Sequence, residues 1–220
     1  MAACDVKSNR KPEEWYASYN YNGMNSWNTV NDPDDVDDVQ LARDIISELE
    51  TRLSIDHGMI YATGMSAGAR MTSRLACELD GTLAAVAPVA GVQFPVDCQA
   101  DRAVPIVTFH GKQDMINTYV HSEDSRPYWI SGVEDSLAGW VDKDGCAENP
   151  SIEIVTDAVA RLRWGGCRDG AEIVFYSIAD GGHTWPGSSI VRTSPWSGKT
   201  SKDITATQLI WDFFSAHPLP

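Results

Sequence analysis

The sequence has no long apolar run and few basic residues. The longest apolar stretch, residues 83–94, is short and contains Pro88, so no segment approaches the length of a membrane-spanning helix. Lysine and arginine number 17 against 31 aspartates and glutamates, which gives a formal net charge of −14. Such a surface repels nucleic-acid phosphates and anionic lipid headgroups, so neither nucleic acid nor a membrane is expected as a partner.

The sequence also lacks a Cys-x-x-Cys motif, although it contains five cysteines. Zinc ribbons and thioredoxin-type redox sites are therefore disfavoured. Two pairs, Cys77/Cys98 and Cys146/Cys167, are each 21 positions apart. This spacing fits two disulfides in an oxidising compartment and equally fits free buried thiols, whereas Cys4 is expected to be unpaired.

A length of 220 residues fits one domain. Residues 1–30 are polar and aromatic without a clear period, so we expect a poorly specified extension there, and nothing in them has the apolar core of a signal peptide. Residues 31–220 are expected to form the domain. The acidic run at residues 31–38 predicts a helix start, with Asp32 as the cap and Pro33 in the first position. A cation site is the less favoured interpretation, because the run lacks calcium-loop spacing.

Short apolar strands then alternate with amphipathic helices. Strands are expected at residues 59–63, 83–89, 105–109, 152–164 and 172–178, and helices after residue 68, at residues 129–141 and at residues 203–214, the last capped by Asp203 or Ser201. This alternation predicts an α/β fold with a mostly parallel sheet and helices on both faces. Trp140, Trp164 and Trp211 are expected to lie in the core.

The most informative local motif is Gly64-Met65-Ser66-Ala67-Gly68, which lies between an expected strand and an expected helix. A nucleophilic serine needs such a sharp strand-to-helix turn, and small residues two positions on either side let the backbones pass closely. Ser66 is therefore the candidate nucleophile, and the Ala67 N–H is a candidate oxyanion donor. Met65 is expected to shape the nearby substrate pocket.

A serine hydroxyl requires a base, and in this class of sheet the order along the chain is Ser, acid, His. Asp114 follows the strand at residues 105–109, and His183 lies in a glycine-rich loop after the strand at residues 172–178. We expect Asp114 to orient His183, which acts as general base and then as general acid. Asp180 is the alternative acid, but it is too near His183 in sequence to face it easily. His110 precedes the acid and is interpreted as structural.

Aromatic residues near these positions are candidates for lining a pocket. Trp185 follows His183 and is expected to form a wall of the acyl or aromatic pocket. Tyr119 and Trp129 follow the acid, and they either line the entrance or pack on the surface. No cluster with metal-ligand spacing is present, so no metal and no cofactor is expected.

Four segments, "YATGMSAGARMTSRLACELDGTLAAVAPVAG", "VPIVTFHGKQD", "GGHTWPG" and "TATQLIWDFF", together resemble the secreted polyhydroxybutyrate depolymerase/feruloyl esterase family of α/β-hydrolases. The resemblance extends over residues 25–217. It implies a serine esterase with Ser66, Asp114 and His183 as triad and with an acyl-enzyme mechanism. It also implies Cys77–Cys98 and Cys146–Cys167 disulfides, an extracellular location, and an ester substrate that is polymer-linked or aryl, such as feruloylated or acetylated polysaccharide or polyhydroxyalkanoate.

One departure from that family concerns the segment before Trp27. Family members carry several strands and a His-Gly loop there that donates to the oxyanion, whereas about 26 residues precede Trp27 and none of them indicates such a loop. We therefore expect an amino-terminally truncated member, a fragment, or a compact variant with another oxyanion donor. A second donor is not evident in the sequence, and its loss would lower the rate of hydrolysis. The alternative hypothesis is a weak or inactive domain that only binds a polymer or a partner chain. The oligomeric state is not indicated.

Overall fold

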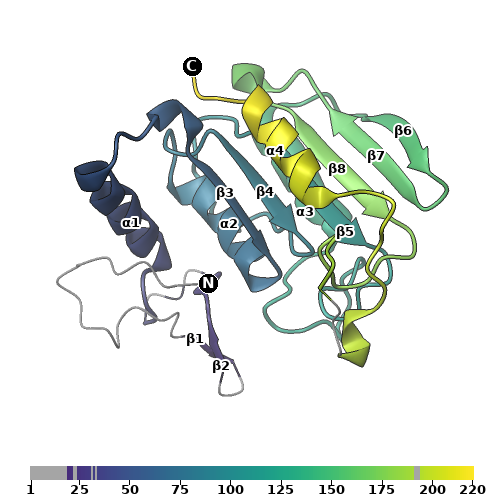
Figure 1. Ribbon diagram of the computed structural model, residues 1–220. Coiled ribbons are helices and arrows are strands. Elements are labelled where there is room, and N and C mark those ends of the chain that lie inside the picture. The colour runs from purple at the N-terminus through teal and green to yellow at the C-terminus, as the bar shows by residue number, and fades with distance from the viewer. Residues whose placement is uncertain (1–18, 22–23, 31, 33, 191–193) are drawn as a thin grey trace.

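The computed structural model describes residues 19–21, 24–30, 32, 34–190 and 194–220. Its centre is a six-stranded sheet in the order β3-β4-β5-β8-β7-β6 (Figure 1). The strands are β3 (Tyr61–Met65), β4 (Ala85–Val89), β5 (Ile106–Gly111), β6 (Ser151–Thr156), β7 (Val159–Trp164) and β8 (Ile173–Ile178). Strands β3, β4, β5 and β8 are parallel, and β6 and β7 add an antiparallel hairpin at one edge. The expected α/β fold with a mostly parallel sheet is confirmed.

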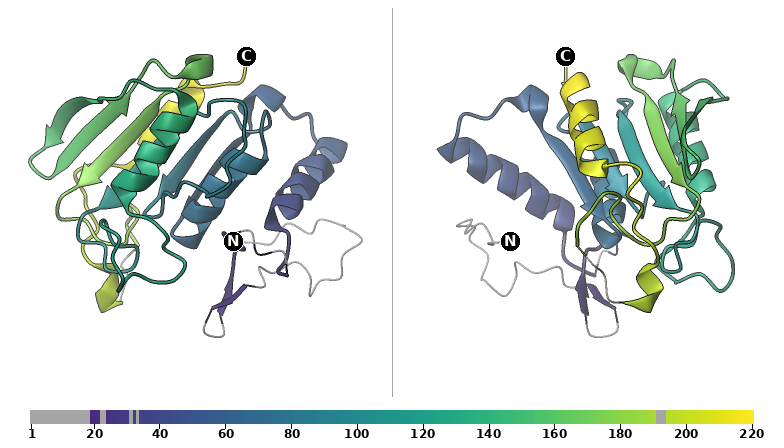
Figure 2. Two further views of the ribbon diagram at one scale, coloured as in Figure 1. Left: turned by 180° about the vertical axis from the view of Figure 1, so that it is seen from behind. Right: turned by 45° about the vertical axis from the view of Figure 1, so that its right-hand side comes forward.

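Helices cover both faces of this sheet (Figure 2). The α-helices are α1 (Asp38–Arg52), α2 (Ala67–Glu78), α3 (Val133–Asp144) and α4 (Ala206–Ala216), and three short 3₁₀ helices span His57–Met59, Arg168–Gly170 and Pro195–Ser197. Helices α2 and α3 pack on one face, and α4 packs on the other. A two-stranded hairpin, β1 (Tyr19–Tyr21) and β2 (Met24–Ser26), precedes α1.

Two large apolar clusters form most of the core, one on each face of the sheet, and a small third cluster surrounds Cys167. Trp140 and Trp164 are buried in the cluster beneath α2 and α3, as expected. The expectation for Trp211 is wrong, because this side chain is 57% exposed on α4. Its neighbour Ile210 is buried, and adjacent helical residues point in directions about 100° apart, so only one of the two faces the sheet.

Several expected element boundaries are wrong. The helix expected at residues 129–141 is α3, which spans Val133–Asp144. Helix α1 begins after Asp37, which caps the Gln40 N–H, rather than after Asp32, whose own carboxylate accepts from the Asp34 N–H. Helix α4 begins after Thr205, whose side chain makes no capping hydrogen bond, rather than after Asp203 or Ser201. The single strand expected over residues 152–164 is a hairpin, because the chain turns between β6 and β7. Pro33 and Cys4 lie outside the described residues.

The two cysteine pairs implied by the family resemblance are disulfides in the structure. Cys77 is bonded to Cys98, and Cys146 is bonded to Cys167. Cys77 lies near the end of α2, which runs back from the carboxyl end of β3, and Cys167 follows the end of β7, beside the start of β8. Both bonds therefore lie at the edge of the sheet where the parallel strands begin.

Candidate active site

Ser66 occupies a strained turn between β3 and α2. Its backbone angles, φ 59° and ψ −118°, lie in a region that non-glycine residues rarely adopt. The Ser66 N–H donates to the Val89 carbonyl at 3.0 Å, and the Ser66 carbonyl accepts from the N–H groups of Ala69 and Arg70. These bonds hold the turn in place, so the expected sharp bend at the serine is confirmed.

The first glycine of the motif is required by a close approach of two backbones. A Cβ atom on Gly64 would lie 2.6 Å from the carbonyl carbon and oxygen of Gly68. A Cβ atom on Gly68, in contrast, would meet no atom within 4 Å. The two glycines therefore differ in role: a side chain at position 64 would push the turn apart, whereas the space around position 68 is open.

Asp114 and His183 are brought into contact by the loops that follow β5 and β8. The His183 Nδ1–H donates to Asp114 Oδ2 at 2.7 Å, and both side chains are buried. The other carboxylate oxygen, Oδ1, accepts from the backbone N–H groups of Ile116 and Asn117 at 2.8 and 2.9 Å. With Nδ1 bonded in this way, the Nε2 atom of His183 is the nitrogen that remains to accept a proton.

The two loops are also joined through their backbones. The Gln113 N–H donates to the Gly181 carbonyl at 2.9 Å, and the Lys112 N–H donates to the Ile178 carbonyl at 2.8 Å. A Cβ atom on Gly111 would collide with the Gly181 carbonyl, so glycine at the end of β5 permits this contact. The glycine-rich sequence around His183 thus brings its loop directly against the loop of Asp114.

His110 and Asn117 both contact the Asp114 carboxylate. The His110 Nε2–H donates to the Asn117 carbonyl at 2.8 Å, and the same atom lies 3.4 Å from Asp114 Oδ2. Burial lowers the pKa of His110, an effect that the nearby carboxylate of Asp114 opposes, so this imidazole stays neutral. The interpretation of His110 as structural fits this position.

Asn117 also connects the acid loop to the serine turn. Its amide nitrogen donates to the Ala90 carbonyl at 2.7 Å, and its amide oxygen accepts from Arg70 in the turn of α2 that follows Ser66. Asn117 is fully buried. Nothing in the sequence indicates this role, because the role depends on contacts with three separate segments, and an asparagine three positions after an aspartate is a common local turn pattern.

Ser66, Asp114 and His183 all lie at the carboxyl edge of the parallel strands, the lower edge in Figure 1. Ser66 follows β3, and Asp114 follows β5, two strands away, which corresponds to about 10 Å at the usual strand spacing. Ser66 is half-buried. Asp180, the alternative acid, is instead paired with Lys199 at a more exposed position.

The candidate pocket residues line one cavity beside the serine turn. Met65 and Trp185 both line a cavity of about 660 Å³, together with Thr63, Gly64 and residues of the loop at 184–190. Trp185 is held by a 3.0 Å hydrogen bond from its Nε1–H to Thr207 Oγ1. Ala67 is the first residue of α2, so its N–H belongs to the positive end of the helix and has no partner within it.

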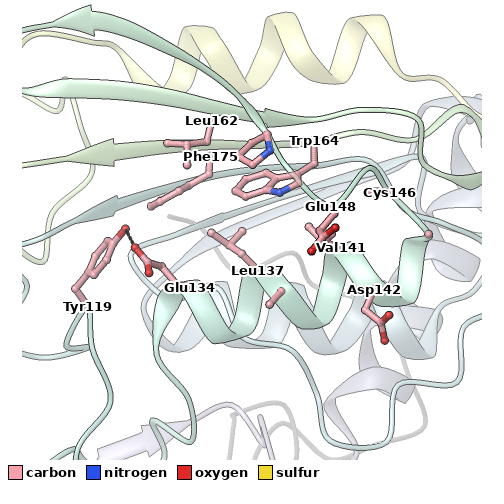
Figure 3. A pocket seen from close by; sticks show the side chains of 13 residues that line it. Tyr119, Glu134, Leu137, Val141, Asp142, Cys146, Glu148, Leu162, Trp164 and Phe175 are labelled. Carbon is pink, nitrogen blue, oxygen red and sulfur yellow. Dashed lines mark hydrogen bonds between the residues drawn. The ribbon is translucent and has the colours of Figure 1, made fainter.

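A second cavity, of about 620 Å³, lies between α3 and strands β7 and β8 (Figure 3). Tyr119 lines this cavity, and its hydroxyl donates a hydrogen bond to Glu134 Oε1. Burial raises the pKa of Tyr119 to about 12. Trp129 is completely buried and donates to the Thr118 carbonyl. Both expectations for Trp129, a place at the entrance or on the surface, are therefore wrong: this ring belongs to the core.

None of the helices in the part of the chain that the structure describes is both long enough and apolar enough to cross a membrane. The same part of the chain contains no group of three or more His, Cys, Asp or Glu side chains arranged to hold a metal ion.

The sheet, the covering helices and the serine turn together define an α/β-hydrolase-type fold. A solved structure described as a thermostable esterase has the same fold, with a TM-score of 0.51 and 19% sequence identity, and the match covers 88% of this chain and 41% of that one. No protein-family model matches the chain.

Two curated relatives of the chain are named as esterases. The chain is 29% identical over 167 residues to feruloyl esterase B of Piromyces equi, covering 72% of this chain and 31% of that protein. It is 27% identical over 205 residues to a bifunctional acetylxylan esterase/xylanase of Neocallimastix patriciarum, covering 88% of this chain and 25% of that protein. The chain thus spans less than a third of either relative. The resemblance to esterases of the α/β-hydrolase type is confirmed.

Proposed function

We propose that this chain is a serine carboxylic ester hydrolase and that residues 31–220 form its catalytic domain. The observation that carries the proposal is the buried Asp114–His183 hydrogen bond at the sheet edge where Ser66 occupies its strained turn. A buried carboxylate bonded to imidazole Nδ1 fixes the tautomer that a general base needs. The similarity to proteins named esterases supports the same chemistry.

The proposed reaction has two steps. The Ser66 hydroxyl attacks the ester carbonyl while its proton passes to His183 Nε2, and the resulting imidazolium is stabilised by Asp114. His183 then gives this proton to the departing alcohol, which leaves an acyl group on Ser66. A water molecule, deprotonated by His183, releases the acid and restores the serine. The Ala67 N–H and the amino end of α2 stabilise the negative oxygen in each step.

We propose aryl or polymer-linked esters as substrates. The cavity beside Met65 and Trp185 has the size of a small-molecule site and offers an aromatic wall to an aryl or acyl group. The relatives named feruloyl esterase and acetylxylan esterase point to feruloyl or acetyl esters of a polysaccharide, and the family resemblance adds polyhydroxyalkanoate. Two disulfides favour an extracellular location.

A second candidate function is binding of a polymer or partner chain with little or no hydrolysis. It is favoured by the position of β3, the strand that leads into Ser66, at an edge of the six-stranded sheet. An edge strand presents unpaired backbone groups to another chain. Among the residues that the structure describes, no strand pairs with β3 on its other side, where a second oxyanion donor would come from.

Hydrolysis of p-nitrophenyl acetate separates the two functions. We expect turnover by the wild type, loss of at least about 10⁴-fold in kcat for Ser66→Ala, and unchanged turnover for the exposed control Ser54→Ala. A p-nitrophenyl phosphonate should form an O–P bond with Ser66 and release p-nitrophenol, so that the phosphonyl group replaces the hydroxyl proton on the peptide that contains Ser66, and no peptide of Ser66→Ala should be labelled. A folded wild-type protein without turnover and without labelling would favour the binding function.

A further inference from the structure

Arg70 is a buried cation without a carboxylate partner. It lies in α2, one turn after Ser66, and only 5% of it is exposed. Its Nη1 donates to Asn117 Oδ1 at 3.3 Å, and its guanidinium lies 4.3 Å from the centre of the Tyr128 ring. Among the described residues no aspartate or glutamate is within ion-pair distance of it, and Nε has no hydrogen-bond partner. Burial lowers the pKa of Arg70 to about 10, which leaves it charged at neutral pH.

The next arginine of the same helix, Arg74, has a carboxylate partner for its guanidinium and can be compared with Arg70. Arg74 is equally buried, and its Nη1 donates to the Asn28 carbonyl. Its opposite edge binds the Glu78 carboxylate through two bonds, from Nε at 2.5 Å and from Nη2 at 3.3 Å. Like Arg74, Arg70 donates from Nη1 to an oxygen, in its case Asn117 Oδ1. The position four residues after it holds Arg74 rather than an acid, so the helix provides no carboxylate for its Nε edge.

Both arginines line one small cavity between α2 and the loop after β4. The cavity has a volume of about 170 Å³, which is room for roughly five water molecules. Gln93 and Thr29 supply further polar groups, and the apolar side chains of Val96 and Ile130, both exposed, lie at its mouth. The acids that line it are Glu78, which Arg74 neutralises, and the exposed Asp97. Its size admits a carboxylate with a few attached atoms, so the remainder of any larger ligand would lie outside the mouth.

We infer that this cavity binds a small carboxylate, which pairs with the Nε edge of Arg70 as Glu78 pairs with that of Arg74. A guanidinium and a carboxylate form two parallel charge-assisted hydrogen bonds, and a site already screened from water strengthens them. The cavity does not include Met65 or Trp185, so the site is separate from the proposed ester pocket. Its occupant is either a free small acid or a sugar acid of a polysaccharide, since both present the same group.

Binding is measured on the whole chain carrying Ser66→Ala, so that no ester chemistry interferes, by NMR titration with acetate and with D-glucuronate. Acetamide and D-glucose, which lack the charge, serve as the matched neutral ligands. We expect at least one acid to bind and neither neutral ligand to bind. Acetate alone would indicate a free small acid, and tighter binding of glucuronate would indicate a sugar acid. Binding of neither acid would overturn the inference.

Variants locate the site. Arg70→Met should lower the affinity for the acid by at least about tenfold. Arg52→Met makes the same charge change on the surface of α1 and should leave this affinity unchanged. Arg70→Met also removes the hydrogen-bond donor to Asn117. A second pair of variants, both at exposed positions, therefore tests the cavity without changing any buried residue. Val96→Asp adds a negative charge at the mouth and should weaken binding, and the equally exposed Val120→Asp should not.

Equal binding by folded Arg70→Met and wild type, or by Val96→Asp and Val120→Asp, would refute the site. These measurements do not depend on hydrolysis. A chain that hydrolyses esters but binds no acid retains the proposed function and loses this inference. A chain that binds an acid through Arg70 but hydrolyses no ester would retain this inference and lose the proposed function.

Discussion

The two glycines of the serine motif should respond to alanine in opposite ways. Alanine at position 64 places a methyl carbon 2.6 Å from the Gly68 carbonyl, well inside the 3.4–4 Å of an ordinary contact. The turn must then open by about 1 Å, and overpacking of this kind costs about 2 kcal/mol of folding free energy. For a chain of this length that corresponds to a melting temperature lower by about 4–8 °C. Displacing the proposed nucleophile Ser66 by 1 Å should cost about 10² in kcat/KM.

Alanine at position 68 is the matched control. Its methyl group meets no atom within 4 Å, and the residue is helical. Removing a glycine from a helix stabilises it by about 0.5–1 kcal/mol, so the melting temperature should rise by roughly 1–4 °C. Thermal denaturation followed by circular dichroism, at one scan rate and without reductant, measures both shifts. If the two variants move the melting temperature in the same direction, close backbone approach is not the reason for glycine at position 64.

Three further predictions concern the acid, the buried histidine and a disulfide. Asp114→Asn should lower kcat on p-nitrophenyl acetate by about 10⁴, whereas Asp180→Asn should change it by no more than a few-fold, and the reverse ranking would contradict the proposed triad. Burial lowers the pKa of His110, so the stability that its neutral form provides is complete above the unfolded pKa of about 6.5 and is lost as the pH falls below that value. The urea midpoint of the wild type should therefore fall more steeply from about pH 7 to about pH 5 than that of His110→Gln, and parallel curves would refute this role. Replacing Cys77 and Cys98 together by serine should lower the free energy of unfolding by about 3 kcal/mol with kcat at 25 °C unchanged, as urea titration and steady-state kinetics would show.

The arrangement of the site was predictable because it follows from local order along the chain. Ser66, Asp114 and His183 each follow an apolar strand, and the carboxyl ends of parallel strands meet at one edge of a sheet. The GxSxG spacing predicts the turn because a backbone crossing needs a glycine at a fixed offset. The structure shows that this requirement falls on Gly64 and not on Gly68, a difference that the spacing alone does not contain.

The features that sequence reasoning missed depend on contacts between distant segments. Asp32 has the residue type of a helix cap, but a hydrogen bond from its neighbour Asp34 occupies its carboxylate, and Asp37 caps α1 instead. Asn117 and Arg70 lie 47 positions apart, and each has an ordinary local context, so nothing in the sequence indicated that they connect the acid loop to the serine helix. Hydrophobic pattern identified β6 and β7 as extended chain but not the turn between them.

The two disulfides at the amino edge of the sheet have a consequence for inactivation by heat. Covalent bonds close that end of the molecule, whereas the loops that carry Asp114 and His183, at the opposite end, are held together by hydrogen bonds such as Gln113 to Gly181. On warming, these two loops should separate while the cross-linked end keeps its helices and strands. Hydrolytic activity is therefore expected to disappear at a lower temperature than the helical ellipticity, and to return on cooling for as long as the cross-linked end has stayed folded.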